Sequence, residues 1–228
     1  MRQLPLGVRI ADRAVFASFL PAQNLQVIEH LRRVARGEAT GATWICGATG
    51  VGKSHLLQAV SAEASGAARS GYFPLAEIMR LGVGALEGLP QLDCVCFDDI
   101  DRVTGKPDWE LALFGLLREI EERGGRLVAS ATAPPALVEW SLPDLGSRFG
   151  AAAIFQMRTL DEHEQQQALQ LHAHVRGFEL PDETAHWLQR RYPRDMRTLY
   201  TLLDTLDEAA LIAQRRLTVP FIRSVLRR

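Results

Sequence analysis

The stretch 47–54 constrains the fold of this chain more than any other. It reads GATGVGKS and matches the phosphate-binding pattern G-x4-G-K-[ST] at every position. An apolar run precedes it and a helical pattern follows it, which is the strand, loop and helix context of this pattern. Glycines let the backbone fold around an anion, so that N–H groups point inward at the positive end of a helix. The pattern therefore predicts a nucleotide site.

Two side chains of this loop have expected roles of their own. Lys53 would bridge the β- and γ-phosphates of the nucleotide, and Ser54 would ligate Mg²⁺. The contacts to the nucleotide are expected from the loop and the start of its helix, namely Gly47, Thr49, Gly50, Val51, Gly52, Lys53, Ser54 and His55.

Two adjacent carboxylates, Asp98 and Asp99, follow the apolar run 94–97. Such a pair after a buried strand indicates a cation, since carboxylate oxygens are the ligands that Mg²⁺ prefers. Asp98 is expected in the Mg²⁺ shell and Asp99 is expected to polarise an attacking water. Cys94 and Cys96 share one face of the same strand and are expected in the core.

Composition excludes several classes of protein. The chain has 228 residues, 47% of them hydrophobic, which suits one large or two small globular domains. Three cysteines without a C-x-x-C pair exclude a disulfide scaffold and a Cys-rich zinc site, and they predict reduced thiols in the cytoplasm. No apolar run reaches 18 residues, so no membrane span or membrane partner is expected. A formal net charge of −1 is not typical of a strongly basic nucleic-acid binder.

Short apolar runs alternate with helical patterns as far as Met157. Strands are predicted at 43–46, 71–75, 92–97, 127–131 and 154–157, and this alternation predicts an α/β fold with a parallel sheet covered on both faces. Helices are predicted at 160–176, 182–192, 196–215 and 219–226, and Asp161 with Glu164 predicts a capping box. We expect a flexible peptide at 1–11, an α/β nucleotide-binding domain at 12–158 and a helical domain at 159–228.

The order of these motifs resembles the AAA+ ATPases of the DnaA/Hda branch. The loop at 47–54, the Asp98–Asp99 strand end and the run 127–132 follow one another as in an AAA+ module. Other segments of the chain also resemble parts of this family. Residues 16–19 with Asn24 are similar to its adenine-side segment, 142–149 to its arginine-finger box and 194–199 to its sensor-2 helix. Segments similar to those of Hda are 176–178, 180–182 and 217–221. The resemblance covers about residues 12–228. It implies an AAA+ P-loop domain with a five-stranded parallel sheet and a small C-terminal all-α lid.

The resemblance also implies residue roles. Arg148 would be the finger offered to a neighbour's nucleotide, and Arg197 would contact phosphates from the lid. Thr132 stands at the sensor-1 position, where the family often has Asn or Asp, and Asn24 would lie on the adenine side. The expected cofactors are ADP or ATP with Mg²⁺.

The first residues resemble a peptide that binds the β sliding clamp. Gln3, Leu4, Leu6 and Val8 would be its anchors in a preformed pocket, although Gly7 departs from the usual bulky residue or proline. The resemblance implies a regulator that, with the DNA-loaded clamp, stimulates hydrolysis of DnaA-bound ATP and so inactivates DnaA. Its own ATPase activity would be weak.

Two other functions stay open at this point. One is a DnaA-like adaptor or loader that recruits a replication partner without triggering hydrolysis, and the other is a truncated initiator that binds DNA itself. The sequence shows no counterpart of DnaA's helix-turn-helix domain, and 76–91 is too short for DnaA's extra helix. We therefore expect contact with DNA only through the clamp. The sequence does not choose between ADP and ATP, or between monomer and homodimer.

Overall fold

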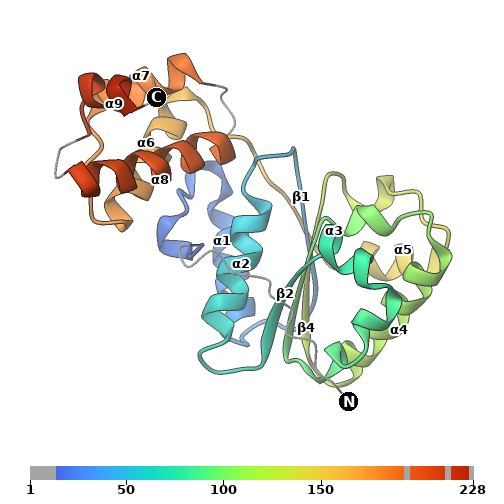
Figure 1. Cartoon of the computed structure of the whole chain (residues 1–228). Helices are drawn as coiled ribbons and strands as arrows, with labels where there is room; N and C mark the ends of the chain where they lie inside the picture. Colours follow the sequence, from blue (N-terminus) through green and yellow to red (C-terminus); the bar gives the residue numbers. More distant parts are fainter. Residues whose placement is uncertain (1–13, 193–195, 214–216, 226–228) are drawn as a thin grey trace. The chain divides into compact units, whose positions relative to one another are not determined.

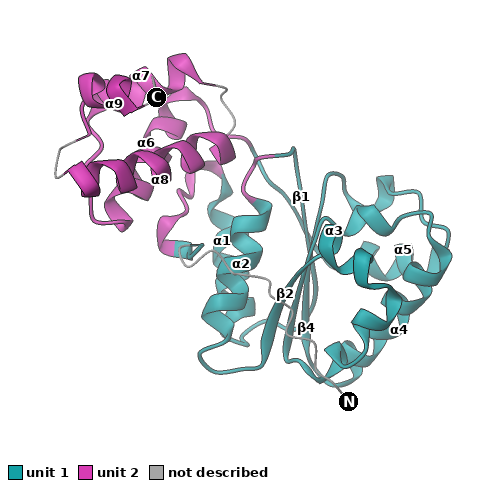
Figure 2. Cartoon of the chain, in the orientation of Figure 1, with its two compact units in different colours: residues 1–16, 24–49, 53–158 teal, residues 17–23, 50–52, 159–228 magenta. Residues whose placement is uncertain are grey.

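The computed structural model describes residues 14–192, 196–213 and 217–225. The anchors of the expected clamp peptide therefore lie outside the described residues. The described chain forms two compact units (Figures 1 and 2). Unit 1 holds residues 14–16, 24–49 and 53–158, and unit 2 holds 17–23, 50–52 and the described part of 159–225.

Unit 1 is built on a five-stranded parallel sheet, which confirms the predicted fold class. In chain order the strands are β1 Gly41–Cys46, β2 Ser70–Pro74, β3 Cys94–Asp98, β4 Arg126–Ala131 and β5 Ala153–Gln156. Their order in the sheet is β2-β3-β4-β1-β5, and each neighbouring pair is parallel. Every residue of β3 and β4 is buried, as expected for central strands covered on both faces.

Helices cover both faces of this sheet (Figure 1). Helices α1 Leu25–Ala35 and α2 Lys53–Ala64 lie on one face, and α3 Leu75–Ile78, α4 Pro107–Glu122 and α5 Pro143–Gly150 lie on the other. Apolar side chains recur every three or four residues along α4, so one face of this helix is buried in the core with β3 and β4. Cys94 and Cys96 are fully buried, as predicted.

The stretch 76–91 contains the rest of the short helix α3 and then a series of 3₁₀ turns. After α3 the chain makes three 3₁₀ turns, η3 Met79–Leu81, η4 Val83–Leu86 and η5 Leu89–Gln91. Gly82 and Gly88 separate these turns with a φ of 85° at each, a conformation that breaks a continuing helix. The remaining 3₁₀ turns are η1 Phe16–Ser18, η2 Ala22–Asn24, η6 Ile100–Val103 and η7 Pro135–Leu137.

Unit 2 consists mainly of helices α6 Glu162–Val175, α7 Asp182–Arg191, α8 Met196–Ala213 and α9 Val219–Val225. The predicted capping box begins α6: the Asp161 side chain accepts from the Glu164 N–H, and the Glu164 side chain accepts from the Asp161 N–H, both at 2.8 Å. An apolar core from all four helices holds this unit together. None of the described helices is long and apolar enough to cross a membrane.

The Glu110 side chain ties two loops of unit 1 together. This residue of α4 is 0% exposed, and its two carboxylate oxygens accept from the N–H groups of Gly105 and Leu142, each at 2.7 Å. Gly105 follows η6, and Leu142 is the residue before α5. One buried carboxylate thus fixes the turn after η6 and the start of α5.

We expect Glu110→Ala to lower the free energy of unfolding by about 3 kcal/mol, because it removes two hydrogen bonds to one buried carboxylate. Urea denaturation measures this change. Glu119→Ala on the exposed side of the same helix is the matched control, with an expected change within about 0.5 kcal/mol. Equal effects of the two substitutions would show that the Glu110 hydrogen bonds do not stabilise the fold.

Candidate nucleotide-binding site

The order of the strands brings the predicted motifs to one edge of the sheet. Strand β4 lies between β1, which leads into the loop at 47–52, and β3, which ends at Asp98. Cys46 pairs with Ala131, and Phe97 pairs with Ala129. Parallel strands end at the same edge, so the loop, the end of β4 and the two aspartates follow neighbouring strands there.

The phosphate loop has the backbone that its glycines predict. Gly50 and Gly52 have φ values of 82° and 102°, which side chains rarely permit. A Cβ atom on Gly52 would also lie 2.6 Å from Cε2 of Phe19, so glycine is required there for two reasons. Helix α2 begins at Lys53, directly after the loop, which places the positive end of a helix at this position.

The Lys53 side chain is folded into the loop. It is 6% exposed, and its Nζ donates to the carbonyl oxygens of Gly47 at 2.6 Å and Ala48 at 3.1 Å. The ammonium group is therefore held against the backbone that would surround a phosphate. His55, in the first turn of α2, lies with Nε2 3.0 Å from the Val15 carbonyl oxygen.

The Asp98 carboxylate is 5% exposed and is bound on both oxygens. Oδ1 accepts from the Ser130 hydroxyl at 2.5 Å, and Oδ2 accepts from the Tyr72 hydroxyl at 2.6 Å. The same Ser130 oxygen accepts from the Asp99 N–H at 2.9 Å. Strands on both sides of β3 therefore fix the Asp98 carboxylate, since Tyr72 lies on β2 and Ser130 on β4.

Tyr72 lies near helix α2 as well as Asp98. The side chains of Ser54 and Gln58, both on α2, are close enough to the Tyr72 hydroxyl to affect its pKa. Burial, and then the nearby Asp98 charge, raise the pKa of Tyr72, and the neighbouring Gln58 and Ser54 side chains only partly oppose this shift. The hydroxyl therefore stays protonated at neutral pH and remains a donor to Asp98.

Asp99 has a different environment from Asp98. Its φ of 55° lies in the left-handed region, and its N–H bond to Ser130 holds the backbone in this strained conformation. Its Oδ2 is 3.2 Å from Nε of Arg102, and the Asp99 side chain is 40% exposed. The two adjacent aspartates thus differ in environment: Asp98 is buried and held by two hydroxyls, and Asp99 is accessible.

Two other side chains expected to contact the nucleotide form hydrogen bonds within the protein. Oγ1 of Thr132 donates to Oδ2 of Asp101 at 2.5 Å, and the Thr132 N–H donates to the same oxygen at 2.9 Å. The buried Asn24 side chain pairs with the backbone of Arg158, accepting from its N–H at 2.8 Å and donating to its carbonyl at 2.9 Å. In this structure both side chains hold loops together.

The two expected arginines lie in different units. Arg148 is in the last turn of α5, where its Nη1 is 2.5 Å from Oε2 of Glu121 and its guanidinium lies 5.1 Å from the centre of the Phe114 ring. Both Glu121 and Phe114 belong to α4, and the Arg148 side chain remains 34% exposed. Arg197 is an exposed residue in the first turn of α8, in unit 2.

Sequence reasoning missed three residues of this region: Tyr72, Ser130 and Glu121. Ser130 left a signal, because it is the one polar residue in the apolar run 127–131, which proves to be fully buried. No sequence pattern singles out Tyr72 or Glu121, since tyrosine is common in strands and acidic residues are common on amphipathic helices.

The residues at this edge fit a nucleotide-bound Mg²⁺. Mg²⁺ is usually held by one or two protein oxygens together with phosphates and waters, and the Ser54 hydroxyl and Asp98 carboxylate are oxygens of this kind. Each Asp98 oxygen accepts one hydroxyl bond and has capacity for another. Within the described ranges, no group of three or more His, Cys, Asp or Glu side chains is arranged to hold a metal. The bound ion would neutralise phosphate charge.

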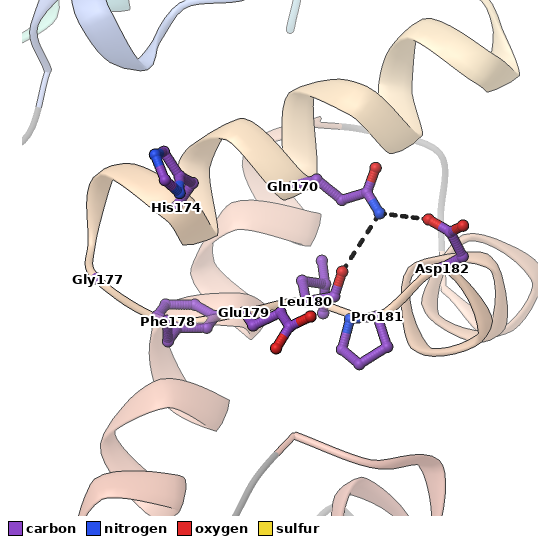
Figure 3. A pocket seen from close by; sticks show the side chains of 8 residues that line it. All are labelled: Gln170, His174, Gly177, Phe178, Glu179, Leu180, Pro181 and Asp182. Atoms are coloured by element: carbon purple, nitrogen blue, oxygen red, sulfur yellow. Dashed lines mark hydrogen bonds between the residues drawn. The ribbon is translucent and has the colours of Figure 1, made fainter.

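A pocket in unit 2 contains none of the expected nucleotide contacts (Figure 3). It is lined by the end of α6, the connection to α7 and the first residue of α7. Nε2 of Gln170 donates to the Leu180 carbonyl at 3.3 Å and to Oδ1 of Asp182 at 2.6 Å. These bonds join α6 to the start of α7.

Comparison with known proteins relates the helical part of the chain to a family model and the whole chain to a known fold. Residues 161–226 match the family model of the Hda lid domain. Domain III of the replication initiation protein DnaA from Thermotoga maritima superposes with a TM-score of 0.78 at 19% identity, over 95% of this chain and 96% of that chain. The chain therefore carries an Hda-like lid domain and has the fold of DnaA domain III.

Two further solved structures share the fold of this chain. AMPPCP-bound DnaA from Aquifex aeolicus matches with a TM-score of 0.64 and 19% identity, over 79% of this chain and 61% of that chain. The Thermotoga maritima RuvB Holliday junction branch migration motor matches with a TM-score of 0.63 and 17% identity, over 89% of this chain and 67% of that chain. The chain thus has a fold common to these DnaA and RuvB structures and spans about three fifths of the Aquifex protein.

We expect Lys53→Ala to abolish ADP binding by this protein, because the phosphates lose their main counter-charge. Isothermal titration with ADP measures the affinity. Lys106→Ala is the matched control, since Lys106 is exposed and is the only other lysine of the sequence. An unchanged affinity in Lys53→Ala would show that this loop does not bind the nucleotide.

Proposed function

We propose that this protein inactivates DnaA. In this proposal it binds ADP or ATP with Mg²⁺ at the loop of 47–54, docks on the DNA-loaded sliding clamp through its N-terminal peptide, and presents Arg148 to ATP bound in DnaA. The observation that carries the proposal is the Hda lid domain at residues 161–226, in a chain with the fold of DnaA domain III.

The placement of Arg148 supports a role toward a neighbouring molecule. Its only partners among the described residues, Glu121 and Phe114, hold it on one side, and a third of the side chain is exposed. Ion pairs at such exposure contribute about 1 kcal/mol or less, so exchanging Glu121 for a phosphate costs little. The exchange would bring a planar, permanently charged group to the transferring phosphoryl.

Arg148 would act by electrostatic stabilisation of the transition state. Water attacks the γ-phosphorus of ATP, and the bond to the bridging oxygen breaks with charge spread over the phosphoryl oxygens. A guanidinium placed there stabilises the transition state more than the bound ATP, so its effect falls on the rate of hydrolysis. An arginine supplied in trans can raise such a rate by about 10³–10⁵.

One observation favours a second function, that of a DnaA-like adaptor that recruits a partner without triggering hydrolysis. Arg148 is already neutralised by Glu121 at 2.5 Å, and an adaptor would keep this ion pair when bound. A single-turnover assay separates the two functions: labelled ATP is bound to DnaA, and this protein is added with the DNA-loaded clamp. An adaptor would leave the hydrolysis rate unchanged.

We expect Arg148→Ala to reduce the stimulation of DnaA's ATP hydrolysis by at least about a hundredfold, or about 2.7 kcal/mol of transition-state stabilisation. The single-turnover assay measures it, and thermal melting with ADP checks that the variant is folded and loaded. Arg118→Ala is the matched control, because Arg118 is an exposed arginine of α4 paired with Glu122. Stimulation at the wild-type rate by Arg148→Ala would exclude it as the finger.

We expect the triple substitution of Gln3, Leu4 and Leu6 by Ala to remove clamp binding and to leave the melting temperature unchanged. Two leucine anchors buried in a pocket contribute roughly 3–6 kcal/mol to binding. A clamp pull-down measures binding, with Arg9→Ala as a control within the same N-terminal stretch. Retention of the triple variant on the clamp would contradict this docking site.

A further inference from the structure

We propose that Tyr72 and Ser130 are positioning residues for the Mg²⁺ of the bound nucleotide. In this proposal they fix the Asp98 carboxylate, and Tyr72 also orients the Ser54 hydroxyl, so that both magnesium ligands are set before the ion arrives. The inference rests on the nucleotide site proposed above and on no property of DnaA or the clamp.

Two hydrogen bonds hold the Asp98 carboxylate in a fixed orientation. Its two oxygens accept from hydroxyls on the two strands that flank β3, at 2.5 Å from Ser130 and 2.6 Å from Tyr72. A carboxylate held on both oxygens cannot rotate about its terminal torsion without breaking a short, charge-assisted bond. Ser130 is itself fully buried, which fixes its hydroxyl beneath the carboxylate.

The single proton of the Tyr72 hydroxyl limits the hydrogen bonds that this group can form. A phenolic hydroxyl has one proton, and here that proton is donated to Asp98. The Ser54 side chain lies near the same hydroxyl, and any hydrogen bond between the two must be donated by Ser54, because the one Tyr72 proton is already used. A Ser54 hydroxyl that donates in this direction keeps its oxygen lone pairs for a cation.

The consequence concerns Mg²⁺ more than the nucleotide. Lys53 and the loop N–H groups bind phosphate without Tyr72, so affinity for ADP alone should not depend on this hydroxyl. Groups that orient metal ligands typically change metal affinity by 10- to 100-fold when they are removed. The gain in ADP affinity on adding Mg²⁺ therefore measures the positioning.

The test is titration of the full chain with ADP, once with MgCl₂ and once with EDTA. For Tyr72→Phe we expect the Mg²⁺-dependent gain in affinity to fall by about tenfold, equal to about 1.4 kcal/mol, with the EDTA affinity within about twofold of wild type. Ser130→Ala should reduce the same gain and serves as the assayable variant if Tyr72→Phe does not fold. Tyr200→Phe is the matched control, because it removes the hydroxyl of a tyrosine in unit 2.

Each outcome decides the proposal. A purely structural role would lower the melting temperature of Tyr72→Phe and Ser130→Ala without changing the Mg²⁺-dependent gain, and an unchanged gain overturns the inference. A wild-type chain that does not bind ADP overturns the nucleotide site and the inference together. Loss of the gain in a protein that fails to stimulate DnaA would support the inference and count only against the proposed regulation.

Discussion

The Asp98 carboxylate at the end of β3 is the group on which the candidate site depends. A buried charge that is only 5% exposed is costly unless hydrogen-bond donors surround it, and two hydroxyls from the described part of the chain are donors to Asp98. Both hydroxyls come from neighbouring strands, so the site exists only if β2, β3 and β4 are adjacent and in register. The strand order is therefore needed to stabilise the Asp98 carboxylate as well as to form the apolar core.

Local patterns predicted the elements of this fold well and their contacts poorly. The loop at 47–54, the strands and the Asp161 capping box depend on residues close in sequence, and a single pattern identifies each. The bonds from Tyr72 and Ser130 to Asp98 join residues 26 and 32 positions apart. They follow from β3 lying between β2 and β4, an order that no local periodicity encodes.

Arg148 and Arg176 show how differently two arginines can be held. The side chain of Arg176 is 4% exposed and lies between Asp204 and Asp207 of α8, so its charge is part of the interior of unit 2. Arg148 faces one glutamate and an aromatic ring, and a third of its side chain is exposed. Moving Arg176 would leave two acids without their cation, whereas moving Arg148 exposes one glutamate to water. Only the second arginine is suited to change partners.

The Glu110 side chain couples two loops of the α/β unit to each other. Its two oxygens anchor the turn that follows the Asp98–Asp99 strand end and the first residue before α5, which carries Arg148. A displacement of that turn either carries the start of α5 with it or strips a buried carboxylate of one of its two donors. The turn after the acidic end of β3 and the start of the Arg148 helix are therefore fixed to α4 through one side chain, so neither can shift independently of the other without the loss of a hydrogen bond.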